Sequence, residues 1–100
     1  MEASTGWKEF FRNWPDEMPR SGVLVTSFGE QIPFDGFMLT DTLLLIQRKT
    51  PDTVGTRQLV LSYQNILALK ITDVVKPKVF TAQGFEGRPS KKSARQSRPS

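Results

Sequence analysis

Three apolar segments follow one another between Val23 and Ile46 (VLVTSFGEQIPFDGFMLTDTLLLI), and a single glycine, Gly36, interrupts the second. A glycine inside a strand weakens it and usually marks a bulge or a sharp bend. A β-branched residue at Gly36 is therefore expected to destabilise the protein strongly, because it supplies neither the bend nor the space. Gly29 suits the turn before the second segment, since glycine adopts positive φ at little cost. We expect three short strands, near 23–28, 31–39 and 43–49.

Two further strands are predicted downstream, near 56–62 and 66–72. The segment TPDTVG before the first of them has the Pro-Asp chemistry of a turn, and Gly55 closes it. Only a very short break, around SYQN, separates the fourth strand from the fifth. Five strongly bent strands on a chain of 100 residues favour a small antiparallel barrel.

An amphipathic helix is predicted before the strands. Thr5 or Gly6 can cap its start, and Pro15 ends it because proline disfavours helical geometry in the residue before it. Since so short a helix is not stable alone in water, its apolar face should pack on the barrel; the alternative is that this face docks a partner. Four aromatic residues at the i, i+3, i+4, i+7 spacing of one helix face form it: Trp7, Phe10, Phe11 and Trp14.

The net charge of +4 is unevenly distributed along the chain. Residues 1–75 hold seven Lys/Arg and nine Asp/Glu, a net of −2, whereas residues 76–100 hold seven Lys/Arg and one acidic residue, a net of +6. We expect a folded domain at 5–75, an extended segment at 76–87 and a disordered basic tail at 88–100. The tail is either a solvated end or a weak, salt-sensitive contact for nucleic acid. Its candidate phosphate-binding residues are Lys91, Lys92, Arg95 and Arg98.

The sequence contains no cysteine and no histidine. Disulfides, thiolate metal sites and a histidine-based catalytic triad are therefore excluded. The scattered carboxylates fit a solvated surface better than paired acid–base catalysis, and no phosphate-binding glycine loop is present. We predict no enzyme: no catalytic residue, metal, cofactor or small-molecule substrate. No apolar run is long enough to span a membrane, so a cytoplasmic protein with no membrane partner is expected.

The order of these elements resembles the Sm-like family, which includes Sm and LSm proteins and the bacterial host-factor RNA chaperones. The resemblance covers about Trp7 to Thr72 and depends on the helix, the five bent strands, Gly36 in the second strand and the short fourth-to-fifth connection. It implies a mainly β fold: an N-terminal helix followed by a five-stranded, strongly bent antiparallel barrel of the SH3-like or Sm-like type. It also implies homo-oligomeric rings joined through the fourth and fifth strands, with single-stranded RNA bound by loops around the pore.

Carried over to this chain, the family pattern implies a nucleic-acid site on two loops. The aspartate after the second strand corresponds to Asp41, one residue early, but Leu45 stands where the family has a base-holding asparagine. The family's Arg-Gly or Lys-His pair before the last strand is replaced here by Ser62 and Tyr63, and Tyr63 offers an aromatic face on which a base could stack. The candidate binding residues are Asp41, Thr42, Ser62, Tyr63 and Gln64.

Two functions are consistent with the sequence. One is weak binding of RNA or another nucleic acid by a small oligomeric Sm-like barrel. The other is a protein-interaction or scaffold module without a nucleic-acid role. The segments GFMLTDTLLLIQRK and RQLVLSYQNILALKI also resemble the middle strands of pleckstrin-homology-like or GRAM domains. Those folds need further strands and a C-terminal helix, and no helix is expected after Ile71.

Overall fold

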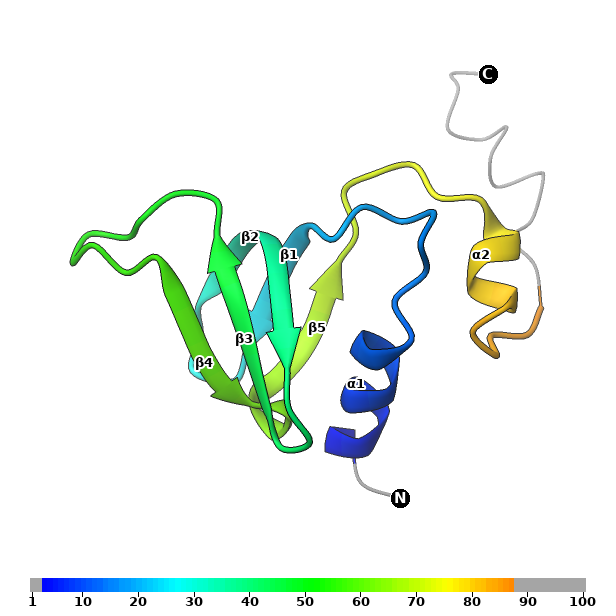
Figure 1. The fold of residues 1–100 in the computed structure, drawn as a ribbon, viewed down its shortest axis with the longest axis horizontal. Helices are drawn as coiled ribbons and strands as arrows, with labels where there is room; N and C mark the ends of the chain where they lie inside the picture. Colours follow the sequence, from blue (N-terminus) through cyan, green and yellow to red (C-terminus); the bar gives the residue numbers. More distant parts are fainter. Residues whose placement is uncertain (1–2, 88–100) are drawn as a thin grey trace.

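The structure, a computed structural model, describes residues 3–87, in which one β-sheet is preceded by one α-helix and followed by a second, shorter one (Figure 1). The strands form a single antiparallel sheet in the order β4-β3-β2-β1-β5. The predicted mainly β class, with an N-terminal helix and five antiparallel strands, is confirmed. The elements are α1 (Ala3–Arg12), β1 (Gly22–Thr26), β2 (Gln31–Leu39), β3 (Leu43–Arg48), β4 (Gln58–Ser62), the 3-10 helix η1 (Tyr63–Asn65), β5 (Ile66–Lys70) and α2 (Pro77–Thr81).

A bulge in β2 lies at the predicted bend. The register against β3 shifts between Phe34 and Gly36, so that the strand contains one extra residue there. Because side chains alternate between the two faces of a strand, this extra residue changes which positions face the core. Ile32 and Phe34 are buried before the bulge, and Phe37, at the opposite parity, is buried after it. The bulge thus lets β2 contribute three large side chains to the core.

At Gly36 the structure leaves room for a Cβ. A Cβ placed on Gly36 would lie 3.8 Å from the Cβ of Gln47, which is an ordinary contact, and its φ is not positive. The position that lacks room is Gly22 at the start of β1. A Cβ there would lie 2.7 Å from the carbonyl oxygen of Lys70 on β5. Close approach of two backbones, which no sequence periodicity reports, therefore requires the glycine in β1.

Helix α1 covers the core with part of its aromatic face. Phe11 and Trp14, the latter just beyond the helix, are buried, and their ring centroids lie 5.0 and 4.8 Å from that of Phe37. Trp7 and Phe10 are only partly buried against the same core. The predicted stripe is confirmed as core packing for its C-terminal half.

The predicted start of α1 is wrong. Ala3 and Ser4 already belong to the helix, so Thr5 and Gly6 lie inside it and do not cap it. The helix ends at Arg12, three residues before Pro15. Proline disfavours helical geometry at the residue before it, Trp14, which lies outside the helix.

The sequence predicted an extended segment at 76–87, but this segment contains the short helix α2. Pro77 occupies its first turn, where the missing N–H is no loss and the fixed φ suits a helix. Val79 is buried and Phe80 packs against the edge of the core. The Nε2 of Gln83 donates a hydrogen bond to the carbonyl of Asn13, 3.0 Å away, and so joins this segment to the end of α1. The expectation that no helix follows Ile71 is therefore also wrong.

Candidate functional site

A polar depression lies where α1, the β2–β3 turn and η1 meet. It has a volume of about 210 Å³, and it brings together all five candidate residues that the sequence placed in the folded part of the chain. Two loops separated by about twenty residues of sequence contribute to it, together with two side chains from α1. Its lining residues are Thr5, Lys8, Asp41, Thr42, Ser62, Tyr63 and Gln64.

Hydrogen bonds hold the two loops in place. The Tyr63 hydroxyl donates to the carbonyl of Thr40 at 2.8 Å, which joins η1 to the β2–β3 turn. Within that turn, the Oγ1 of Thr40 accepts hydrogen bonds from the backbone N–H groups of Leu43, at 2.9 Å, and Thr42, at 3.2 Å. A threonine hydroxyl that bonds nearby backbone amides in this way stabilises a tight turn.

Tyr63 has a structural role in the depression rather than the expected one of stacking a base. Its residue is 3% exposed and its hydroxyl is already used by Thr40. Burial away from water raises the pKa of Tyr63 above its ordinary value of 10.0; Arg12 opposes this shift and Asp41 adds to it. The phenol is thus neutral at physiological pH, and its ring presents no free face to a ligand.

The electrostatics of the depression depend on Asp41. Its Oδ1 lies 3.2 Å from the Nζ of Lys8 and 3.7 Å from an Nη of Arg12, both on α1. These exposed ion pairs contribute little to stability. The ion pairs do affect ligand binding: the Asp41 carboxylate offsets the positive charges of Lys8 and Arg12, which would otherwise attract a phosphate group.

Lys8 and Arg12 were not among the residues predicted from sequence. They lie about thirty residues before Asp41, and only the packing of α1 beside the β2–β3 turn brings them to it. The four predicted tail cations, Lys91, Lys92, Arg95 and Arg98, lie outside the described residues.

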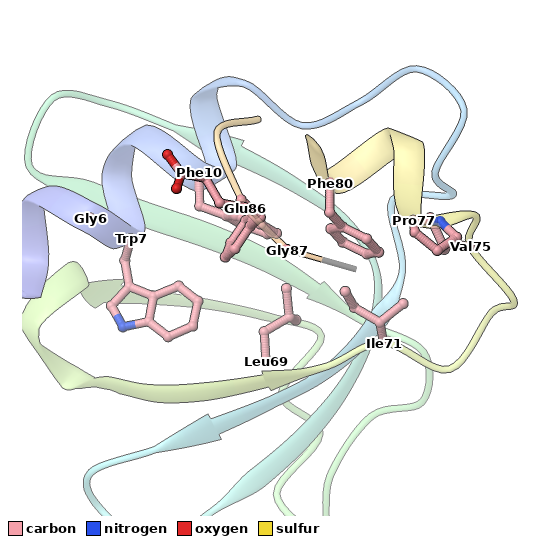
Figure 2. Close-up of a pocket in the computed structure, with 11 residues that line it drawn as sticks. Gly6, Trp7, Phe10, Leu69, Ile71, Val75, Pro77, Phe80, Glu86 and Gly87 are labelled. Atoms are coloured by element: carbon pink, nitrogen blue, oxygen red, sulfur yellow. The ribbon is translucent and has the colours of Figure 1, made fainter. Parts of the chain in front are cut away.

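A second and larger concave surface, which we call the apolar groove, lies between α1, β5 and α2 (Figure 2). Its volume is about 910 Å³, within the range of binding pockets. Trp7 and Phe10 reach it from α1, Leu69 and Ile71 from β5 and the residue just after it, and Phe80 from α2. Its remaining lining residues are Gly6, Val75, Pro77, Phe85, Glu86 and Gly87.

The apolar groove exists because of two features that the sequence did not predict. The N-terminal half of the aromatic stripe on α1 is only partly covered by the core, and α2 folds back beside it. Phe85 contacts both walls: its ring centroid lies 6.4 Å from that of Phe10 and 6.1 Å from that of Phe80, edge to face in each case. The proline at position 77, followed by Val79 and Phe80, was the one sequence signal for this helix.

Within residues 3–87, no three His, Cys, Asp or Glu side chains lie close enough together to hold a metal ion. None of the helices in this part of the chain has both the length and the apolar character needed to cross a membrane. The two concave surfaces described above differ in character: one is small and polar, and the other is large and apolar.

Comparison with known proteins gives no relative: no family model matches the chain, and neither a curated protein nor a solved structure shows significant similarity to it.

Proposed function

We propose that this protein is a non-enzymatic, Sm-like small β-barrel that assembles with copies of itself and serves as a protein-interaction module. The observation that carries the proposal is the sheet order, which puts β4 at one edge and β5 at the other. Among the described residues, β4 pairs only with β3, and β5 only with β1. Each edge offers unpaired backbone N–H and C=O groups to a further strand.

The chemistry of the two edges supports pairing between copies. Both strands are five residues long and largely apolar, with the sequences QLVLS and ILALK. Natural edge strands that must stay single are blunted by proline, by central lysines or by a covering element. Neither strand contains proline, and the one lysine, Lys70, is the last residue of β5. Val60 on β4 and Leu67 on β5 are both exposed.

A contact between β4 of one copy and β5 of the next is heterologous, because different surfaces meet. Repetition of such a contact gives a closed ring or an open filament, depending on the rotation at each step. Assembly also suits a domain of this size, whose own core is small.

The solution mass tests the proposal. We expect a defined multiple of the 11.3 kDa protomer in light scattering coupled to size exclusion. Val60→Lys, at a residue that is 54% exposed on β4, should yield folded monomers because a charge opposes strand pairing. Val54→Lys is the matched control: it makes the same change at an 84% exposed valine in the β3–β4 loop and should leave the assembly intact.

A wild-type protein that stays monomeric at about 100 μM would contradict self-assembly. Equal masses for the Val60→Lys and Val54→Lys variants would contradict assignment of the contact to β4. Circular dichroism on both variants establishes that each remains folded.

A second candidate function is weak binding of single-stranded nucleic acid at the polar depression. The observation that favours it is the convergence of Asp41, Thr42, Ser62 and Gln64, with Lys8 added from α1. The ion pairs of Asp41 and the burial of Tyr63 weigh against it, since they remove positive charge and a stacking face. We therefore rank it below the interaction module.

Titration of labelled oligo-uridine and oligo-adenine at two salt concentrations tests this second function. The variant protein replaces the tail cations Lys91, Lys92, Arg95 and Arg98 with glutamine. Binding that persists in this variant and is lost on Lys8→Gln supports a site at the depression. Binding lost with the tail charges assigns contact to the tail alone, through phosphates and without sequence recognition. Absence of binding by the wild type rejects the function.

A further inference from the structure

We propose that the face of the sheet opposite the core binds a second copy of this chain, face to face, about a two-fold axis that runs along β3. We call this surface the outer face; it is formed by Met38, Leu43, Leu45 and Val60. The contact uses a surface other than the two sheet edges, and it stands whether or not the edges pair. Three observations carry it: the exposure of the outer face, its lack of charge, and the order of its side chains.

The outer face is the apolar side of three strands, left uncovered by the rest of residues 3–87. Side chains alternate along a strand, so the neighbours of buried core residues such as Phe37 and Leu61 point away from the core. These neighbours are themselves apolar: Met38 is 69% exposed, Val60 54% and Leu43 42%. A sheet with one face in water normally carries polar residues on that face. Exposed apolar residues gathered in one patch mark an interaction surface.

The strand register places three of these side chains next to one another. Met38 on β2 pairs with Leu45 on β3, which in turn pairs with Val60 on β4. The three therefore form a row across the sheet, at the strand spacing of about 4.8 Å. Leu43 lies on the same face, two positions before Leu45 on β3. The outer face is thus a continuous apolar strip.

The absence of charge on this strip selects a second copy as its partner. At one end of the strip Gln47 pairs with Gln58, and at the other end Leu43 pairs with Ser62, so the flanking polar side chains are neutral. A charged surface repels an identical copy, whereas a neutral surface does not. The strip offers an oppositely charged partner nothing to recognise, and it is compatible with itself.

The order of side chains along the row makes the strip complementary to itself. Met38 is the longest of the three, Leu45 is intermediate and Val60 is the shortest. A two-fold axis along β3 turns the second copy over and sets its β4 above β2 of the first. Met38 then lies over Val60 of the second copy, and Leu45 meets Leu45. A long side chain over a short one keeps the separation even, near the roughly 10 Å of packed sheets.

The solution mass of single-residue variants tests the inference. Met38→Lys puts an unpaired charge into the face contact and leaves the edges intact, because β2 lies inside the sheet. Leu67→Lys, at a 63% exposed leucine on β5, opposes edge pairing alone. In light scattering coupled to size exclusion at about 100 μM, Leu67→Lys should be a dimer and Met38→Lys should have half the wild-type mass. The double variant should be a monomer that circular dichroism shows to be folded.

Val54→Lys, which adds the same charge in the β3–β4 loop, is the matched control and should keep the wild-type mass. Val60→Lys does not serve here, because Val60 belongs both to the outer face and to the β4 edge.

Cross-linking tests the two-fold arrangement. The chain has no cysteine, so introduced cysteines are the only thiols. Met38→Cys and Val60→Cys are each made in the Leu67→Lys protein, one of them with a tag that separates the products on a gel. An equal mixture treated with a short bismaleimide should give at least about fivefold more mixed dimer than dimer of either variant alone, because Met38 faces Val60 across the axis.

Several results would overturn the inference. They are a wild-type mass for Met38→Lys, a monomeric Leu67→Lys protein, or an excess of single-variant dimers over the mixed one. A monomeric wild type that binds neutral lipid vesicles would assign the outer face to a membrane surface instead. A wild-type dimer that Leu67→Lys keeps and Met38→Lys loses would support the outer face and reject the edge contact, so the two proposals fail separately.

Discussion

The guanidinium carbon of Arg20 lies 3.6 Å from the centroid of the Phe37 ring, and an Nη of Arg20 donates a hydrogen bond to the Phe37 carbonyl at 2.9 Å. Trp14 packs against the same ring, 4.8 Å between centroids. Phe37 of β2 therefore contacts both Arg20 in the linker between α1 and β1 and the aromatic residues at the C-terminal end of α1.

Arg20→Lys should lower the free energy of unfolding by about 1 kcal/mol, because lysine keeps the charge but loses the planar group that covers the ring and reaches the carbonyl. Urea denaturation measures the change. Arg57→Lys, at an exposed arginine just before β4, is the control and should be nearly neutral. Equal stability of wild type and Arg20→Lys would show that the contact contributes nothing.

The two strand glycines should differ in how much stability they lose on substitution by alanine. Gly22→Ala should cost about 2 kcal/mol of unfolding free energy, because its Cβ would lie 2.7 Å from the Lys70 carbonyl oxygen and one strand must move. Gly36→Ala should cost less than about 1 kcal/mol, since its Cβ has room beside Gln47. Thermal and urea unfolding of both variants compare them directly. A larger loss at Gly36 than at Gly22 would reverse this interpretation of the two strands.

The aromatic stripe of α1 should divide into two energetic halves. Phe11→Ala should lower the free energy of unfolding by about 3–4 kcal/mol, because the side chain is fully buried against Phe37 and leaves a cavity. Phe10→Ala should cost clearly less, since Phe10 faces the apolar groove and is only partly buried. Chemical denaturation separates the two, and similar losses would mean that the groove is closed by packing in solution.

Asp52 in the β3–β4 loop should titrate below its ordinary pKa. Its Oδ1 accepts hydrogen bonds from the backbone N–H groups of Thr56, at 2.8 Å, and Val54, at 3.0 Å. The bond from Thr56, assisted by that from Val54, lowers the pKa of Asp52 from 3.8, against a smaller opposing effect of burial. A depressed folded pKa means that the loop is stabilised in full above the unfolded value, and that this contribution is lost as the pH falls through the folded one.

NMR measures this effect through the pH dependence of the Thr56 amide shift. Its midpoint should lie below 3.8, and Asp52→Asn should abolish the titration while keeping an acceptor oxygen. A midpoint at or above 3.8 would contradict the hydrogen-bonded loop.

The candidate site at the polar depression was partly predictable. The turn after β2 and the connection before β5 are local features, so Asp41 and Ser62 could be located from the sequence. These two residues share one depression because the two loops meet beside α1. The same packing adds Lys8 to the depression. The burial of Tyr63 was not predictable, because a tyrosine in a short polar connection carries no local sign of the Thr40 carbonyl that receives its hydroxyl.

Local periodicity is enough to explain what could be predicted of the fold: five strands, a helix with an aromatic stripe, and a bend at Gly36. Each of these depends on neighbours a few residues away, and spacing along the chain records such neighbours. The tight approach at Gly22, the folding back of α2 and the apolar groove depend on backbones and rings that are distant in sequence. Their positions result from packing in three dimensions, so they could not be predicted from spacing along the sequence.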